Sequence, residues 1–235
     1  MPNLHLHHLE NSRSFRTLWL LEELGLEYQL TQYDRKNGLA PDSLEQAHPM
    51  GKAPVLEITF DDNSQSDLTL IESGHIINYL LAKYDPDYQL HPKVDADSET
   101  WRDYDFWMQF AEASAMPPLV MRLVFSKVVE RSPKLVRPIT KHVRKQVETS
   151  MIGKNINKVL SLIERHLSEN QWFAGSEFSG ADIQMAFVVE AANARSGKGG
   201  GLDQNKYVNT LNFLNRCQAR PAYQKAVEVG GKLDF

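Results

Sequence analysis

The sequence predicts an α/β domain followed by an all-α domain. Alternating apolar residues, the mark of short half-buried strands, occur only in the N-terminal part of the chain. Apolar residues at helical spacing dominate after a polar, proline-bearing segment at 85–94. The 235 residues allow two domains, and 42% apolar with 24% charged residues excludes disordered and fibrous chains. We therefore expect domains over residues 1–84 and 95–235, joined by a linker at 85–94.

The first elements of the chain alternate between strand and helix. Leucines and histidines alternate over residues 4–7, which predicts a strand with one buried face. A turn at 10–12 leads into residues 13–24, where apolar side chains recur every three or four positions and Gly25 then ends the helix. A second strand begins at Tyr28.

The next elements predict a hairpin followed by a helix. A polar stretch precedes a short helix after Pro41, and alternation over residues 56–60 gives a third strand. Turn-forming residues at 61–66 connect it to a fourth strand at 68–71. Helical periodicity returns from Gly74 to Tyr84.

Beyond the linker the sequence predicts helices only, and one helix start is well marked. Ser179 is a good N-cap, Asp182 stands three residues later as a shortened capping box, and Phe178 with Ile183 fits the hydrophobic staple. We predict a helix from about Gly180 to Ala194.

Charge and composition exclude several partners. The net charge is −4, so nothing attracts nucleic acid to the whole chain. The basic segment 127–145 has no aromatic residue on which bases could stack, and we interpret it as a solvated helical face that could also attract anionic substrates.

The expected compartment is the cytoplasm. No stretch approaches the ~20 apolar residues that span a bilayer, and histidines stand in the first ten residues where a signal peptide needs an apolar core. The single cysteine, Cys217, allows no internal disulfide and is expected to be a packed apolar residue. His5, His7 and His8 form one cluster with no second cluster at ligand spacing, so we expect no metal.

Four segments resemble the glutathione S-transferase family: residues 9–23, with Ser12, Arg13 and Ser14 at the start of a helix; His48 to Val55; Glu72-Ser73; and Phe178 to Asp182. Together they span both domains. The resemblance implies a thioredoxin-like N-terminal domain that binds glutathione and a helical domain that forms the electrophile pocket. The chain is most similar to the bacterial and fungal branch with a serine-arginine-serine helix start, a likeness that residues 111–117 support.

The start of the first helix is the candidate site of thiol activation. A thiol of pKa about 8.5 ionises near neutral pH when a positive potential or a hydrogen-bond donor lies nearby, and a helix N-terminus supplies both. Ser12 matches the serine of serine-type members and is our catalytic candidate. Asn11 and Arg13 are alternatives for that role, and Ser12 as a simple N-cap is the structural alternative.

The resemblance also assigns residues to the rest of glutathione. It implies a cis bond before Pro54, which would leave the backbone of Ala53 free to pair with the cysteinyl residue as an added strand. Val55, two residues further on, belongs to the same expected set of glutathione-binding residues. Glu72 and Ser73 match the γ-glutamyl end, because a carboxylate pairs with the ammonium while a hydroxyl and helix N–H groups hold the carboxylate.

Lys52 is the candidate partner of the glycyl carboxylate. Plant-type members place basic residues about where Leu39 and Ala40 stand here, so Arg35 and Lys36 are alternatives.

The predicted function is conjugation of the glutathione thiolate to a small, apolar electrophile by a cytoplasmic, homodimeric detoxifying transferase. Two alternatives remain open: a glutathione-binding module without turnover, and a glutathione-dependent peroxidase or disulfide reductase. Side chains that could line an apolar pocket, or belong to the helical core, are Trp101, Tyr104, Trp107, Met108, Met116 and Met121.

Overall fold

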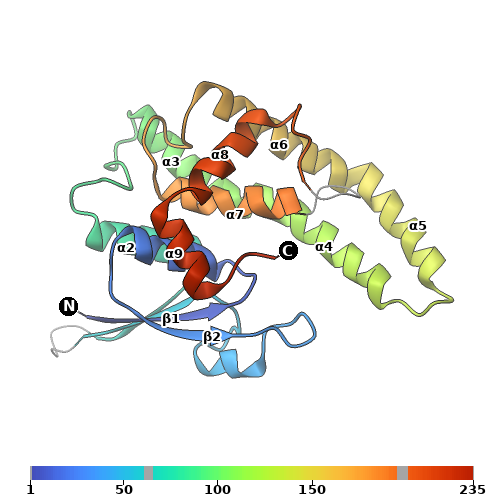
Figure 1. The fold of residues 1–235 in the computed structure, drawn as a ribbon, viewed down its shortest axis with the longest axis horizontal. Coiled ribbons are helices and arrows are strands. Elements are labelled where there is room, and N and C mark those ends of the chain that lie inside the picture. The colour runs from blue at the N-terminus through green and yellow to red at the C-terminus, as the bar shows by residue number, and fades with distance from the viewer. Residues whose placement is uncertain (1, 61–65, 195–200, 235) are drawn as a thin grey trace.

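The α/β domain predicted from the sequence is present, in the order βαβ followed by ββα (Figure 1). The structure is a computed structural model that describes residues 2–60, 66–194 and 201–234. Its N-terminal elements are β1 (Asn3–Leu9), α1 (Ser14–Glu23), β2 (Gln29–Tyr33), the 3₁₀ turn η1 (Asp42–Gln46), β3 (Val55–Thr59), β4 (Leu68–Ile71) and α2 (Ser73–Tyr84). The turn expected at 61–66 lies outside the described residues, except for Ser66.

The four strands form one mixed sheet in the order β2-β1-β3-β4. β1 runs parallel to β2 and antiparallel to β3, and β3 and β4 form the expected hairpin. The alternation in β1 has the predicted effect, since Leu4 and Leu6 join the buried core while His5 and His7 point to the opposite face.

The second part of the chain is helical, as predicted, and the described residues beyond β4 hold no further strand of a sheet. No helix or strand lies between Tyr84 and Glu99. The helices are α3 (Glu99–Phe110), a π-helical turn η2 (Ala111–Ala115), α4 (Met116–Arg131), α5 (Arg137–Val147), a second π-helical turn η3 (Glu148–Ile152), α6 (Gly153–Glu169), α7 (Gly180–Ala194), α8 (Val208–Gln218) and α9 (Pro221–Gly230).

The α-helices lie on one side of the sheet, and the pair α4 and α5 extends away from it (Figure 1). Every residue of α5 is at least partly exposed, which agrees with the solvated basic face expected for this region. Within the described residues, none of these helices has both the length and the apolar character needed to cross a membrane.

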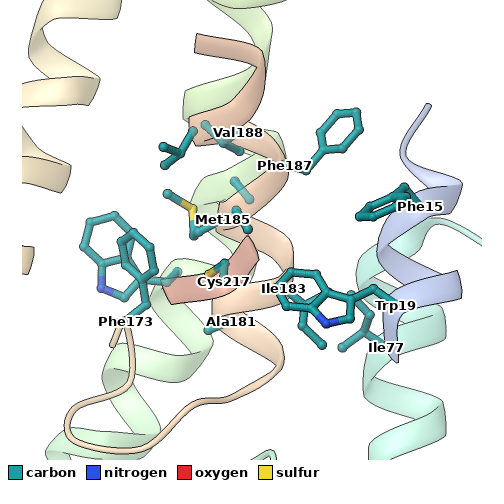
Figure 2. Close-up of a cluster of buried hydrophobic side chains, with 14 of the residues drawn as sticks. Phe15, Trp19, Ile77, Phe173, Ala181, Ile183, Met185, Phe187, Val188 and Cys217 are labelled. Carbon is teal, nitrogen blue, oxygen red and sulfur yellow. The ribbon is translucent and has the colours of Figure 1, made fainter. Parts of the chain in front are cut away.

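Helix α7 is the centre of the core. Figure 2 shows its apolar side chains reaching Phe15 and Trp19 of α1 on one side and Phe173 on the other. Gly180 allows this close packing, because a Cβ there would lie 2.7 Å from Leu81 Cδ1 of α2. Cys217 of α8 is fully buried in the same cluster, as expected (Figure 2).

The start of α7 is capped by Asp182. Its carboxylate accepts a hydrogen bond from the Ser179 N–H (2.8 Å), which is the predicted reach back to the cap residue. The Ser179 hydroxyl (2.9 Å) and the Phe173 N–H (2.8 Å) donate to the same carboxylate, two contacts that the sequence pattern did not predict. Burial outweighs these hydrogen bonds and raises the pKa of Asp182 to about 7.

Helix α9 brings the end of the chain back to the N-terminal domain. Arg220 donates two hydrogen bonds to the Glu23 carboxylate of α1, at 2.6 and 2.8 Å, and its guanidinium lies over the Phe178 ring. Gly230 at the end of α9 lies so close to β1 and α1 that a Cβ there would clash with Leu18 Cδ2. Segments about two hundred positions apart in the sequence thus pack together along α1 and β1.

Candidate active site

Two adjoining hollows, of about 260 and 280 Å³, lie between the sheet and the helices at the start of α1. They share Arg13, Lys52 and Ala53 in their walls. The remaining walls of the first hollow are Met50, Pro54, Ile71, Glu72, Ser73 and Glu112. Those of the second are Leu9, Asn11, Ser12, Arg35, Ala40, Gly51, Met116, Val120, Leu123 and Phe187.

The structure places the predicted site residues together. All of the predicted catalytic and glutathione-binding residues line one or both hollows except Val55, which is buried in the sheet opposite His7 and Ile71. The Ala53–Pro54 bond is cis, as the resemblance implied.

The first hollow ends at the start of α2, where Glu72 and Ser73 stand side by side. Glu72 is exposed and has a φ of +68°, a left-handed conformation that is rare for a residue other than glycine and clusters at functional sites. The Ser73 side chain is almost fully buried, and its hydroxyl donates to Gln184 Oε1 (3.2 Å) of α7. The hydroxyl oxygen also accepts from Arg16 Nη1 (3.1 Å).

Arg16 and Glu112 form a charged pair beneath this hollow that the sequence analysis did not assign. Arg16 is fully buried, and Glu112 Oε1 accepts from Arg16 Nη1 (2.5 Å) and from Arg13 Nε (2.9 Å). Burial lowers the pKa of Arg16 to about 10, so the guanidinium remains charged at neutral pH. Burial alone would raise the pKa of Glu112, but Arg16 and Arg13 together hold it below its ordinary value.

Glu112 reaches this position from the π-helical turn η2 between α3 and α4. Such turns are often found at functional sites, because they redirect side chains within an otherwise regular helix. Arg16 also lies 4.7 Å from the ring centroid of Phe187, a cation–π contact with α7. The sequence did indicate Arg16, because it is an arginine inside an otherwise apolar helical segment. It did not indicate the partner Glu112, which lies 96 positions away.

Ser12 lies at the second hollow and starts a chain of buried hydrogen bonds. Its side chain oxygen is 2.7 Å from the Ser14 hydroxyl, which is 2.9 Å from His8 Nδ1. His8 Nε2 is in turn 3.0 Å from the Gly230 carbonyl oxygen at the end of α9. The chain therefore connects the start of α1 to β1 and to the C-terminal helix.

The carbonyl at the end of this series of hydrogen bonds determines which group donates and which accepts at each step. A carbonyl only accepts, so His8 Nε2 carries the hydrogen, and burial lowers the pKa of His8 and favours the neutral ring. Nδ1 is then an acceptor and receives the Ser14 hydroxyl hydrogen. The Ser14 oxygen accepts from the Leu9 N–H (3.1 Å) and from Ser12.

The loop that carries Ser12 is braced from two sides. The Arg35 guanidinium donates to the Glu10 carbonyl (3.1 Å) and to the Asn11 carbonyl (3.2 Å), while Asn11 Oδ1 accepts from the Asp234 N–H (2.5 Å). Of the two predicted alternatives for the glycyl carboxylate, Arg35 lines the second hollow and Lys36 lines neither.

The apolar wall of the second hollow differs from the expected set. Met116 is in it, but Tyr104, Trp107 and Met108 are buried in the core, and Trp101 lines a separate surface depression on α3. Met121 is partly buried against the core. The wall is completed by Val120 and Leu123 of α4 and Phe187 of α7, which the sequence analysis did not single out.

The fold defines the class of protein as a thioredoxin-like domain joined to an all-helical domain, with a polar hollow at the junction. The family model described as the glutathione S-transferase N-terminal domain matches residues 2–82, and the one described as the glutathione S-transferase C-terminal domain matches residues 118–221. The chain belongs to the glutathione S-transferase family, and it is an enzyme of that kind.

Two curated relatives and one solved structure support this assignment. Glutathione S-transferase 3 of Schizosaccharomyces pombe is 35% identical over 95% of this chain and 86% of its own length. Glutathione S-transferase 1 of Saccharomyces cerevisiae is 30% identical over 83% of each chain. A crystal structure of a glutathione S-transferase from Actinobacillus pleuropneumoniae is 29% identical, has a TM-score of 0.72, and is matched over 98% of this chain and 94% of that one.

Proposed function

We propose that this chain conjugates the thiolate of glutathione to a small, apolar electrophile. The observation that carries the proposal is the contact between the two hollows: a polar one that ends at Glu72 and Ser73, and one that combines Ser12 with apolar side chains. A peptide lying across Lys52 and Ala53, which both hollows share, would present its thiol at Ser12.

The charges around the first hollow are complementary to the γ-glutamyl end of glutathione. Glu72 is an exposed carboxylate that can pair with the ammonium. The carboxylate would be held by the Ser73 hydroxyl and the first N–H groups of α2, which a helix leaves unpaired. Arg16, buried directly behind Ser73, adds a positive charge on the same side.

The other end of the peptide is matched by backbone and basic groups. Ala53, before the cis bond at Pro54, offers backbone for pairing with the cysteinyl residue. Lys52 is exposed at the junction of the hollows and is our proposed partner of the glycyl carboxylate.

Ser12 is the proposed donor to the thiolate. Without a thiolate, the Ser12 hydroxyl hydrogen points to Ser14 across their 2.7 Å contact. When Ser12 turns its hydrogen to the thiolate, the Ser14 N–H still donates to the Ser12 oxygen (3.2 Å), so Ser12 stays in place. The dipole of α1 favours the same negative charge.

The chemistry that follows needs only positioning. The thiolate sulfur forms a bond to the electrophilic carbon, and the leaving group departs with its electron pair. The electrophile would lie against Met116, Val120 and Phe187 in the second hollow, and the rate gain would come from thiolate stabilisation and proximity.

We also propose that the enzyme is a homodimer and acts in the cytoplasm in detoxification. In support of a dimer, α3 exposes an aromatic surface on which Phe106 is 46% exposed and stacks on Phe110. The division into 1–84, a linker at 85–94 and 95–235 is likewise a proposal.

Calorimetry of glutathione binding tests the assignment of the γ-glutamyl end. Glu72→Ala should weaken binding, and the Glu72→Ala, Ser73→Ala double variant more so, because both partners of that end are then lost. Glu99→Ala is the matched control, since Glu99 is also an exposed glutamate at a helix start but lies outside the hollows. Unchanged affinity in the double variant would remove this assignment.

Turnover assays test the reaction class. Purified protein with glutathione should conjugate a halonitroarene or open an epoxide. If glutathione turns over only with a peroxide or a disulfide, and with neither of the other substrates, the reductase alternative is favoured. Glutathione binding without turnover on any of these substrates would favour a binding module.

A further inference from the structure

Three side chains that could bind a metal meet on the face of the sheet opposite α1 and α2. His5 and His7 lie two residues apart on β1, and Glu57 of β3 is the register partner of His5. Side chains two residues apart on a strand share a face, so all three project the same way. The histidines are close together in the sequence, whereas Glu57 is brought beside them only by the pairing of β1 with β3.

The distances among these side chains fit one tetrahedral ion. Glu57 Oε2 lies 3.1 Å from His5 Nδ1 and 3.1 Å from His7 Nε2. Zinc bonds of about 2.0–2.2 Å to nitrogen and oxygen, arranged tetrahedrally, place neighbouring ligand atoms roughly 3.3 Å apart. The two distances to Glu57 therefore need only small shifts, and all three ligand atoms lie within 4.8 Å of one another.

In each imidazole, the ring nitrogen that faces away from Glu57 already makes a hydrogen bond. His5 Nε2 is 2.8 Å from the Thr31 hydroxyl, and His7 Nδ1 is 2.9 Å from the Tyr33 hydroxyl. Metal-binding histidines typically use their second nitrogen in this way, because the outer hydrogen bond fixes the orientation of the ring. Both outer partners come from β2.

The inner nitrogen of His7 is free to bind a cation. The His7 side chain is only 8% exposed, and its buried Nε2 makes no aligned hydrogen bond with any described residue, although it lies within ion-pair distance of Glu57. A single carboxylate oxygen faces both imidazoles. One cation at the centre would satisfy all three groups at once.

We propose that His5, His7 and Glu57 bind a divalent transition-metal ion, with Zn²⁺ as the ion of choice. Two imidazoles and one carboxylate suit zinc and its first-row neighbours, whereas calcium and magnesium prefer oxygen ligands alone. His5 is 29% and Glu57 37% exposed, so the fourth position is open to water.

The site is separate from the glutathione chemistry. None of the three residues lines either hollow. The ion would join β1 to β3 through side chains, and thereby stabilise the sheet that carries the loop of Ser12. We therefore expect metal to raise the melting temperature and to leave glutathione affinity unchanged.

Zinc titration of the tag-free, chelator-treated protein tests the proposal. Calorimetry should show one Zn²⁺ per chain, and Co²⁺ should give the intense visible absorption of a tetrahedral site. His7→Gln and Glu57→Gln should each weaken Zn²⁺ binding by at least ~10-fold, and Tyr33→Phe, which removes an outer hydrogen bond only, by about 10- to 100-fold. His142→Gln, on the exposed α5, is the control and should bind as the parent does.

Glutathione binding by each variant reports whether it is folded. If His7→Gln does not fold, the same titration of Tyr33→Phe and His5→Gln decides. Absence of stoichiometric Zn²⁺ binding by the parent protein would overturn the proposal. Equal Zn²⁺ affinity in the parent and in folded Glu57→Gln would do the same.

Discussion

Replacing Asp182 by alanine should destabilise the protein in a pH-dependent way. The carboxylate is fully buried at the start of α7 and accepts hydrogen bonds from the N–H groups of Phe173 and Ser179 and from the Ser179 hydroxyl. Alanine removes the acceptor of all three. Neither Asp182 nor its partners line the hollows, so glutathione binding should not change.

The magnitude follows from the groups that are left unpaired. Each buried N–H without an acceptor costs about 1–3 kcal/mol, so the two backbone groups predict a loss of roughly 2–6 kcal/mol of unfolding free energy. This loss applies at pH values below about 7, at which the Asp182 carboxyl group of the parent is protonated and no charge is buried. At higher pH the parent itself becomes less stable, because its carboxylate is then charged and buried.

The sign of the pH dependence is set by the raised pKa of Asp182. The pKa is about 7 in the folded chain. In the unfolded chain it is about 3.9, so between these values the folded chain holds a proton that the unfolded chain has lost. The contribution of Asp182 to the unfolding free energy of the parent therefore falls as the pH rises from about 4 to about 7. From pH 5 to pH 7 the fall is about 2 kcal/mol, because the slope of ~1.36 kcal/mol per pH unit flattens as the pH approaches the folded pKa.

Urea unfolding of the parent and of Asp182→Ala at pH 5 and pH 8 measures both effects. We expect a clear loss of stability in the variant at pH 5 that is smaller by about 2–3 kcal/mol at pH 8. Asp105→Ala, at an exposed position on α3, is the control and should match the parent at both values. An equal loss at pH 5 and pH 8, or none at pH 5, would refute the reasoning.

Two further predictions concern packing and assembly. Gly180→Ala should lower the unfolding free energy by about 1–3 kcal/mol through overpacking, because the new Cβ would lie 2.7 Å from Leu81 Cδ1. Urea unfolding measures this loss. A urea midpoint equal to that of the parent would show that α2 and α7 can move apart freely. Light scattering at micromolar concentration should give twice the 26.8 kDa chain mass, and the mass of one chain would contradict the proposed homodimer.

Local sequence patterns predicted the helices and strands because these elements form between residues that are close together in the sequence. The helix over Gly180–Ala194 has the predicted bounds, since an N-cap, a reaching carboxylate and apolar periodicity all lie within it. The predicted strand alternation, the hairpin and the fold class are likewise confirmed. Resemblance, rather than periodicity, implied the cis bond before Pro54, which is also confirmed.

Contacts between distant segments could not be predicted in this way. Arg16 meets Glu112 only because the π-helical turn η2 redirects a side chain of the helical domain, and His8 meets Gly230 only because α9 returns to α1. The same limit applies to the apolar wall of the second hollow. Helical periodicity showed which side chains of α3 are apolar, but not that Tyr104, Trp107 and Met108 pack into the core while Val120 and Phe187 face the hollow.

Residues two positions apart on a helix point about 200° apart, so helix geometry alone predicts that Ser14 faces away from a ligand at Ser12 and satisfies local backbone. Ser14 lines neither hollow and does bond the Leu9 backbone, but it also contacts Ser12 directly. The reason is that Ser12 precedes the helix, so its side chain is free to turn toward the first helical residue.

The thiol pKa of bound glutathione, measured in Ser12→Ala and Ser14→Ala, tests the central claim most directly. Titration of the thiolate absorbance should show the pKa raised in Ser12→Ala by about 1–2 units, because a hydrogen bond to a charged group contributes ~1.5–3 kcal/mol, while glutathione affinity changes little. Ser14→Ala should shift it less, since Ser14 only holds Ser12 in place. An unchanged pKa in Ser12→Ala, with a raised one in Ser14→Ala, Asn11→Ala or an Arg13 variant, would contradict the account and leave Ser12 as a helix cap.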